Sequence, residues 1–171
     1  QQLIPTEALP SPEARLELYG IARDLFVGSG MEEIGIDHFA KPEDGLAVAH
    51  RGGTMHRNFQ GYTEDKSPAL IPVGASSIGR FPQGFAQNEP ATSKYQERVR
   101  AGELATAKGH VFAGDDLVRA RIIEMLLCDF SADFGQVATE YGDDRARLEA
   151  MADGLDEVLP GTTTLEDGIL T

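Results

Sequence analysis

The sequence predicts a mixed fold, α/β in its first part and mainly helical at its end. A helical pattern precedes a short apolar run that ends at residue 37, which is the order of elements in α/β barrels and doubly wound sheets. A stretch rich in glycine, proline, serine and aromatic residues fills the middle of the chain. After residue 115, three helical patterns and a strand pair indicate a winged-helix-like unit.

The first predicted helix begins at Ser11-Pro12-Glu13. Serine caps a helix, proline suits its first turn, and an acidic side chain is stabilised at its positive end. Gly28-Ser29-Gly30 ends this helix. Residues 33–37 then predict a short buried strand, and residues 43–51 predict a second helix. The apolar residues at helical spacing in the first helix are Leu16, Tyr19, Ile21, Ala22, Leu25 and Phe26.

The middle of the chain, from residue 56 to about residue 87, predicts loops with short extended pieces such as residues 69–73. A helix is predicted over residues 92–101, and a short strand or turn over residues 108–112. Together these residues form a loop-rich connector.

A long helix is predicted to begin at Asp115-Asp116. Shorter helices are predicted over residues 134–141 and 144–154, and a hairpin of strands over residues 158–170. The residues expected on the core face of the long helix are Leu117, Ile122, Ile123, Met125, Leu126 and Cys128.

Composition narrows the class of protein. Hydrophobic residues make up 41% and charged residues 25%, as in ordinary globular proteins, and no apolar run approaches the roughly 20 residues of a membrane span. Cys128 is the single cysteine, so we expect a buried structural thiol and a cytoplasmic location. The N-terminus has no basic segment and no apolar core, which argues against a signal peptide. It also lacks methionine, so we expect the chain to be a piece of a longer protein.

The net charge of −13 is unevenly distributed. Residues 111–171 contain 14 acidic residues against 4 arginines, whereas residues 61–110 contain 5 acidic against 6 basic residues. An acidic surface repels phosphate backbones, so we expect no nucleic acid partner.

Two clusters are candidates for function. Asp37-His38 follows the predicted strand, and the carboxyl ends of parallel strands carry active sites in barrels. The alternative is a histidine whose ring bonds the backbone and fixes the turn. Asn58-Phe59-Gln60-Gly61-Tyr62 offers an aromatic face, an amide and a flexible glycine, which suit a flat heterocycle.

Other residues give weaker signals. Residues 73–79 are small enough for close backbone approach but lack the ending of a phosphate-binding loop. His38, His50 and His56 match no familiar ligand spacing, so no metal site is predicted. Arginines in this region either bind substrate carboxylates or form local salt bridges; they are Arg51, Arg57 and Arg80.

Several motifs, in order and spacing, resemble the family of oxygen-independent coproporphyrinogen III oxidases. They are residues 34–44, residues 46–49, His56-Arg57-Asn58-Phe59-Gln60-Gly61-Tyr62-Thr63, residues 74–79 and residues 85–88, with weaker similarity over residues 126–130. The resemblance covers essentially the whole chain and is most specific from residue 34 to residue 88.

The resemblance implies a fold and an activity. It divides the chain into the closing part of a partial α/β barrel (residues 1–65), a connector (66–110) and a truncated, helical, winged-helix-like domain (111–171). The family uses a [4Fe-4S] cluster and S-adenosylmethionine in radical chemistry that converts two propionates of coproporphyrinogen III to vinyls, giving protoporphyrinogen IX in haem biosynthesis. The electron donor is not identified.

The resemblance also implies roles for individual residues. Phe59, Gln60 and Ile78 match positions associated with a second S-adenosylmethionine or with the opening of the active site. Asp37 and His38 are expected to support the pocket, and Arg57 and Arg80 are candidates for substrate binding. No catalytic residue is assigned.

The chain also departs from the family. The cluster-binding cysteines are absent, Met31 replaces a usual aromatic residue, and Pro72 replaces a usual glycine. We therefore expect this polypeptide to be inactive alone and prone to self-association through unpaired sheet edges. Two alternatives stay open at this point: an acidic protein-binding module without catalysis, and a haem-carrying relative of the family.

Overall fold

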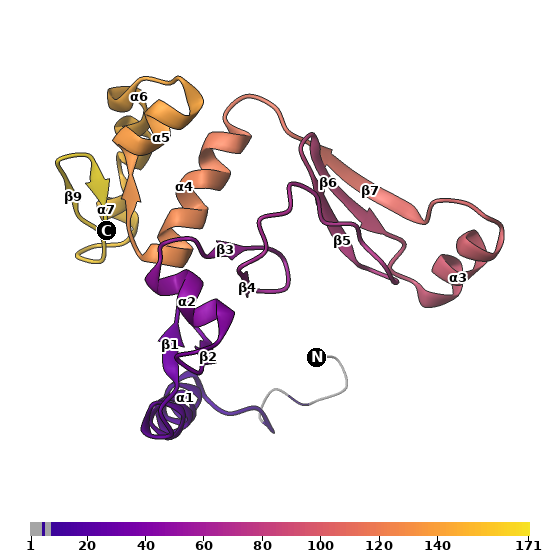
Figure 1. Cartoon of the computed structure of the whole chain (residues 1–171), viewed down its shortest axis with the longest axis horizontal. Coiled ribbons are helices and arrows are strands. Elements are labelled where there is room, and N and C mark those ends of the chain that lie inside the picture. Colours follow the sequence, from indigo (N-terminus) through magenta and orange to yellow (C-terminus); the bar gives the residue numbers. More distant parts are fainter. Residues whose placement is uncertain (1–4, 6–7) are drawn as a thin grey trace. The chain divides into compact units, whose positions relative to one another are not determined.

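A computed structural model describes Pro5 and residues 8–171, and the chain divides into two compact units (Figure 1). The first unit runs to Met55 and includes Tyr62–Glu64. The second comprises His56–Gly61 and Asp65–Thr171. The N-terminal residues that argued against a signal peptide lie outside the described part. The division into residues 1–65, 66–110 and 111–171 stays a prediction.

The first unit begins with helix α1 (Pro12–Gly28), close to the predicted bounds. The Ser11 hydroxyl caps it by accepting a hydrogen bond from the Ala14 amide at 3.2 Å. Helix α2 (Gly45–Arg51) is capped in the same way, because the Asp44 carboxylate accepts from the Leu46 amide at 2.9 Å. No residue of α1 is buried, so this helix presents its apolar side chains to solvent.

The single buried strand predicted over residues 33–37 is wrong in its extent. The segment forms two antiparallel strands, β1 (Glu32–Ile34) and β2 (His38–Ala40), with Ile34 opposite His38. Gly35 causes the turn, because its φ of +58° belongs to a region that other residues rarely adopt. Asp37 and His38 therefore lie in a hairpin, and the expectation that they follow a parallel strand is not met.

The second unit contains a three-stranded sheet whose first two strands lie in the segment predicted as loops, while the third overlaps the short strand or turn predicted over residues 108–112. Its strands are β5 (Ile78–Phe81), β6 (Gly84–Asn88) and β7 (Thr106–Val111), in the order β5-β6-β7 and all antiparallel. The glycines that suggested loops instead permit close approach between strands: a Cβ at Gly84 would overlap the carbonyl of His110. Helix α3 (Thr92–Arg100) confirms the helix predicted over residues 92–101, and it connects β6 to β7.

The helical segment of the second unit begins with α4 (Asp116–Asp129) and α5 (Phe134–Tyr141), both as predicted. The helix predicted over residues 144–154 is α6 (Arg145–Glu149) followed by the 3₁₀ turn η2 (Ala150–Ala152), and a short α7 (Leu155–Val158) follows a left-handed Gly154. The strand pair is shorter than predicted. It consists of β9 (Leu165–Glu166) and β10 (Ile169–Leu170), and β8 (Ala132–Asp133) adds to it in the order β8-β10-β9.

The core of this segment is apolar and contiguous. Its buried members are Val118, Ile122, Met125, Ala132, Phe134, Val137, Leu148 and Leu170. Cys128 is also buried, with 1% of its surface exposed, which confirms the predicted structural thiol. The comparison of this segment with a winged helix stays a prediction.

The structure confirms a mixed helix–strand fold. The strands of the described residues form separate two- and three-stranded sheets, and these do not close into a barrel. Among the described residues, no helix has both the length and the apolar content needed to cross a bilayer.

Candidate functional site

The loop of residues 58–61, flanked by β3 (His56–Arg57) and β4 (Tyr62–Thr63), is folded by its own asparagine. The Asn58 carboxamide oxygen accepts from the amides of Gln60 at 2.8 Å and Gly61 at 3.2 Å. The Asn58 amide donates to the Gly61 carbonyl at 3.0 Å, which closes the turn. Phe59 lies at the tip of this turn, with 56% of its surface exposed.

One face of the β5-β6-β7 sheet combines aromatic, basic and amide side chains. In the antiparallel register, Arg80 pairs with Phe85 and Phe85 pairs with His110. Two residues along each strand, Ile78 pairs with Gln87 and Gln87 pairs with Lys108. Because side chains two residues apart share a face, all six project from the same side of the sheet.

Helix α4 contributes a second apolar surface in addition to its core face. Leu117, Ala120, Arg121, Glu124 and Leu127 recur at intervals of three and four residues, on one side of the helix. The buried core residues of the same helix lie on another side. The helix is therefore apolar on two sides, and the second side is available to a neighbouring element or a ligand.

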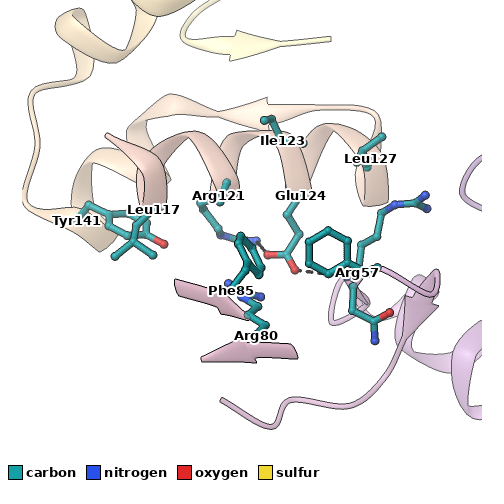
Figure 2. Close-up of a pocket in the computed structure, with 12 residues that line it drawn as sticks. Arg57, Arg80, Phe85, Leu117, Arg121, Ile123, Glu124, Leu127 and Tyr141 are labelled. Atoms are coloured by element: carbon teal, nitrogen blue, oxygen red, sulfur yellow. Dashed lines mark hydrogen bonds and ion pairs between the residues drawn. The ribbon is translucent and has the colours of Figure 1, made fainter. Parts of the chain in front are cut away.

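These elements enclose a cavity of about 440 Å³ within the second unit (Figure 2). Figure 2 shows Arg80 and Phe85 reaching from the sheet toward Arg121 and Glu124 on α4. The residues that line the cavity are Arg57, Asn58, Phe59, Arg80, Phe85, Leu117, Ala120, Arg121, Ile123, Glu124, Leu127 and Tyr141. An apolar cavity with a few convergent polar groups is the usual form of a small-molecule site.

A second hollow of about 210 Å³ lies on the same sheet face. Phe59 and Phe85 line both hollows, so the two are neighbours. Gly109 is exposed here, and a Cβ at this position would come within 3.2 Å of the Phe85 carbonyl oxygen. The lining residues are Phe59, Ile78, Phe85, Ala86, Gln87, Lys108, Gly109 and His110.

Aromatic contacts connect the loop to the sheet. The rings of Phe59 and Phe85 meet edge to face, with centroids 5.0 Å apart and planes at 79°. Phe85 meets Phe112 in the same way, at 5.0 Å and 87°. Edge-to-face contacts of this kind contribute about 0.5–1.5 kcal/mol each beyond burial, so they help to hold Phe59 in place.

Glu124 is the centre of the polar network in the cavity. One carboxylate oxygen lies 3.2 Å from His56 Nδ1 and 3.4 Å from the amide nitrogen of Arg57. The other accepts from Arg121 Nη1 at 3.1 Å, and Arg121 Nε donates to Glu140 at 3.1 Å. Burial lowers the pKa of Arg121, but the hydrogen bonds and charges of Glu140 and Glu124 outweigh it and raise this pKa overall.

Of the residues expected to bind S-adenosylmethionine, Phe59 and Ile78 line the same hollow. Gln60 belongs to the adjacent turn and lines neither hollow. Of the residues expected to bind substrate, Arg57 and Arg80 both line the larger cavity. In Figure 2 the Arg57 side chain extends toward Leu127, near the end of α4, whereas Arg80 lies beside Phe85.

The residues expected to support the pocket, Asp37 and His38, belong to the first unit. His38 Nδ1 lies 2.8 Å from an oxygen of Asp37, so the histidine ring bonds a carboxylate and not the backbone. The ring also meets Tyr62 edge to face at 5.0 Å. Tyr62 in turn accepts a hydrogen bond from the Ile36 amide at 3.1 Å, which ties the β1–β2 turn to it.

Sequence reasoning missed most of the residues that line the cavity, among them Phe85, Arg121, Glu124 and Tyr141. The available signal was the apolar spacing on two sides of α4. Within the part of the chain that the structure describes, no group of three histidine, cysteine or acidic residues is placed to hold a metal ion.

Comparison with known proteins identifies the fold first. The structure matches coproporphyrinogen III oxidase (HemN) from Escherichia coli, described as a radical SAM enzyme, with a TM-score of 0.83 and 31% identity. The match covers 100% of this chain and 40% of that one. No family model matches the sequence.

The sequence relatives then identify the particular protein group. The chain is 51% identical over 148 residues to an oxygen-independent coproporphyrinogen III oxidase of Paracoccus denitrificans, covering 86% of this chain and 33% of that protein. It is 43% identical over 165 residues to the corresponding protein of Cereibacter sphaeroides, covering 96% and 37%. The chain is therefore homologous to one part of the oxygen-independent coproporphyrinogen III oxidases, and it spans about a third of their length.

Proposed function

We propose that this chain is the part of an oxygen-independent coproporphyrinogen III oxidase that carries the second S-adenosylmethionine contacts and one wall of the substrate pocket. The whole protein then decarboxylates two propionates of coproporphyrinogen III to vinyls, giving protoporphyrinogen IX. The observation that carries this proposal is the 51% identity over 148 residues to the Paracoccus denitrificans protein. We propose a cytoplasmic location, as expected from the single cysteine.

The cofactor contacts are assigned to Phe59, Gln60 and Ile78. A purine ring stacks on an exposed aromatic face, and Phe59 is exposed at the tip of a rigid turn beside Ile78 in the hollow. Gln60 follows Phe59 directly, so its amide can reach a polar edge of the same ligand. Lys108 and His110 give this hollow a basic side.

The [4Fe-4S] cluster of the family supplies the radical chemistry when it is bound, and the described residues of this chain do not fit it. A cluster needs several thiolates, and Cys128 is the only cysteine in the sequence. Burial, together with the charges of Glu124 and Asp129, raises the pKa of its thiol to about 11, which disfavours the thiolate ligand. We assign no step of the reaction through the cluster to this chain.

Substrate contacts are assigned to Arg57 and Arg80, with Asp37 and His38 as supports of the first unit. Arginine binds carboxylates through two parallel hydrogen bonds, which suits the four propionates of coproporphyrinogen III. Both arginines line the 440 Å³ cavity.

A chimera tests the proposed function. The matching segment of the Paracoccus denitrificans oxidase is replaced by this chain, and the conversion of coproporphyrinogen III to protoporphyrinogen IX is measured without oxygen. We expect activity in the chimera and a loss of about tenfold or more when Phe59 and Gln60 are both replaced by alanine. Gln96→Ala, on the exposed surface of α3, is the control and leaves the activity unchanged. A folded chimera without activity contradicts the proposal.

We also propose that the isolated chain self-associates through α1. Leu18 and Leu25 are 58% and 69% exposed, and their spacing of seven residues places them on one side of this helix, where contiguous apolar surface favours association. Sedimentation velocity is expected to show oligomers for the chain and monomers for a Leu18→Glu, Leu25→Glu variant. A monomeric parent chain contradicts this proposal.

A further inference from the structure

Asn88, the last residue of β6, is buried although its side chain is polar, with only 6% of its surface exposed. Its side-chain nitrogen donates to the carbonyls of Pro72 at 3.0 Å and Gly74 at 3.1 Å. Its backbone amide donates to the Ser77 carbonyl at 2.9 Å. A carboxamide has two N–H donors, so both are used, and Asn88 holds residues 72–77 at three points.

The segment that Asn88 holds has an unusual backbone. Gly74 has a φ of +109° and Ser76 a φ of +65°. A serine in this region is strained and keeps the conformation only where its surroundings determine it; such residues cluster at functional sites. Further bonds fix the segment: the Ser77 hydroxyl donates to the Val73 carbonyl at 2.8 Å, and the Gly74 amide donates to the Tyr95 hydroxyl of α3 at 3.0 Å.

This segment leads directly into the hollow of about 210 Å³. Ile78 follows it, pairs with Gln87 across the sheet, and lines the hollow together with Gln87. The Gln87 side-chain nitrogen donates to the Ser76 carbonyl at 3.1 Å. Because a carbonyl only accepts, this bond fixes the orientation of the Gln87 amide. Among the residues that the structure describes, none donates to its oxygen, which is therefore available to an N–H group of a ligand.

We propose that Asn88 is a positioning residue for this hollow. By fixing residues 72–77, it sets Ile78 and the Gln87 amide in the places where they receive the adenosyl group of S-adenosylmethionine. Asn88 itself lines neither hollow, so it acts through the segment that it holds. The Gln87 oxygen is an acceptor suited to the exocyclic amine of adenine. This inference rests on the proposed function and deepens it, because it adds a ligand contact and the residue that orients the wall of the hollow.

The test is a calorimetric titration of the 171-residue chain with S-adenosylhomocysteine, a stable analogue of S-adenosylmethionine. Asn88→Asp keeps the shape of the side chain but has no N–H group, so the carbonyls of Pro72 and Gly74 lose their donor. The segment is then free to leave its strained conformation. We expect binding to weaken by about tenfold or more.

Val137→Ala is the matched control for a loss of stability alone. Val137 belongs to the buried core of the helical segment and lines neither hollow. Both substitutions should lower the thermal midpoint, since one leaves buried polar groups unpaired and the other leaves a cavity. Val137→Ala should nevertheless bind the analogue as tightly as the unsubstituted chain.

Tyr95→Phe is a milder second variant that keeps the test valid if Asn88→Asp does not fold. It removes only the hydroxyl that accepts from the Gly74 amide. Binding should weaken by about threefold or more, because one of the bonds that fix the segment is lost.

Two results would overturn the positioning role. The first is no binding of S-adenosylhomocysteine to the unsubstituted chain up to about 1 mM. The second is a folded Asn88→Asp variant, or in its absence Tyr95→Phe, that binds as tightly as Val137→Ala. If binding follows Asn88 but the chimera does not convert coproporphyrinogen III, the proposed function fails and the positioning role stands. If the chimera is active and Asn88→Asp binds normally, the positioning role fails and the proposed function stands.

Discussion

The carboxylate of Glu124, in the middle of α4, accepts a hydrogen bond of 3.4 Å from the amide of Arg57, at the start of the Asn58–Gly61 turn. The two residues are 67 positions apart in the sequence, and only 15% of the Glu124 side chain is exposed. A single carboxylate thus joins the helical segment to the loop that presents Phe59. The position of the loop depends on α4, although neither motif indicates the other in the sequence.

Removing this carboxylate is therefore expected to loosen the loop. Glu124→Ala leaves the Arg57 amide and one donor of Arg121 without their acceptor, at a cost of about 1–3 kcal/mol in the free energy of unfolding. Glu124→Gln keeps an acceptor and is expected to cost less. Urea unfolding measures both, with Glu97→Gln on the exposed surface of α3 as the control. If Glu124→Ala is as stable as the control, Glu124 does not anchor the loop.

Gly35 and Gly53 offer a matched pair for testing the β1–β2 turn. Both have positive φ angles, +58° and +62°, so alanine is strained at either position by about 1–3 kcal/mol. At Gly35 the new Cβ would also overlap the ring of Tyr62, whereas at Gly53 it meets nothing within 4 Å. We expect Gly35→Ala to lower the thermal midpoint clearly more than Gly53→Ala. Equal shifts would mean that the contact with Tyr62 has no energetic role.

The thiol of Cys128 is expected to resist modification in the folded chain. Burial, and then the charges of Glu124 and Asp129, raises its pKa to about 11 from an ordinary value of 9.0. Because the folded state holds the proton more tightly, this group contributes stability below about pH 9 that is lost as the pH rises through about 11. At pH 8 a thiol reagent should react slowly with Cys128 in the folded chain. The reaction should become fast only when urea unfolds the protein. Rapid reaction without urea would contradict the burial of this thiol.

The pKa of the Asp143 carboxyl is shifted in the opposite direction, below its ordinary value. Hydrogen bonds from Arg147, with Nε at 2.8 Å, and then from the Asp144 amide lower its pKa to about 2 from 3.8. Its contribution to stability is therefore present above about pH 3.8 and is lost as the pH falls through about 2. NMR titration of Asp143 should give a midpoint that moves back toward 3.8 in Arg147→Gln. Arg145→Gln, which removes the neighbouring Arg145–Glu149 pair, should leave it in place.

The elements that the sequence predicted well are those specified by local signals. Ser11 and Asp44 cap the first two helices, and α5 has the predicted bounds of residues 134–141. The β5–β6 hairpin was missed because glycine at positions 79 and 84 is typical of loops. In the structure, Gly79 allows its strand to lie close to Pro72, and Gly84 allows its strand to lie close to the backbone of His110. The strand predicted over residues 33–37 is wrong in its extent because Gly35 adopts a positive φ and turns the chain there. This backbone angle could not be read from the sequence.

The candidate site was predicted only in part, for a similar reason. Phe59, Ile78, Arg57 and Arg80 were named from motifs, and the structure places them around two neighbouring hollows. Glu124 and Arg121 lie on a helix whose apolar residues on two sides were all assigned to one core face. The contacts of Glu124 with His56 and Arg57 join residues far apart in the sequence, and no local sequence pattern indicates such contacts.

We infer that the loop of residues 58–61, one face of the β5-β6-β7 sheet and the second side of α4 form one ligand site. The most direct measurement is NMR of the chain with labelled phenylalanine rings during titration with coproporphyrin III. This stable oxidised form of the proposed substrate has a macrocycle that strongly shifts the resonances of nearby protons. We expect large shifts at Phe59 and Phe85, and none at the buried Phe134. Shifts of similar size at all three rings, or none at Phe59 and Phe85, would show that these elements do not form one site.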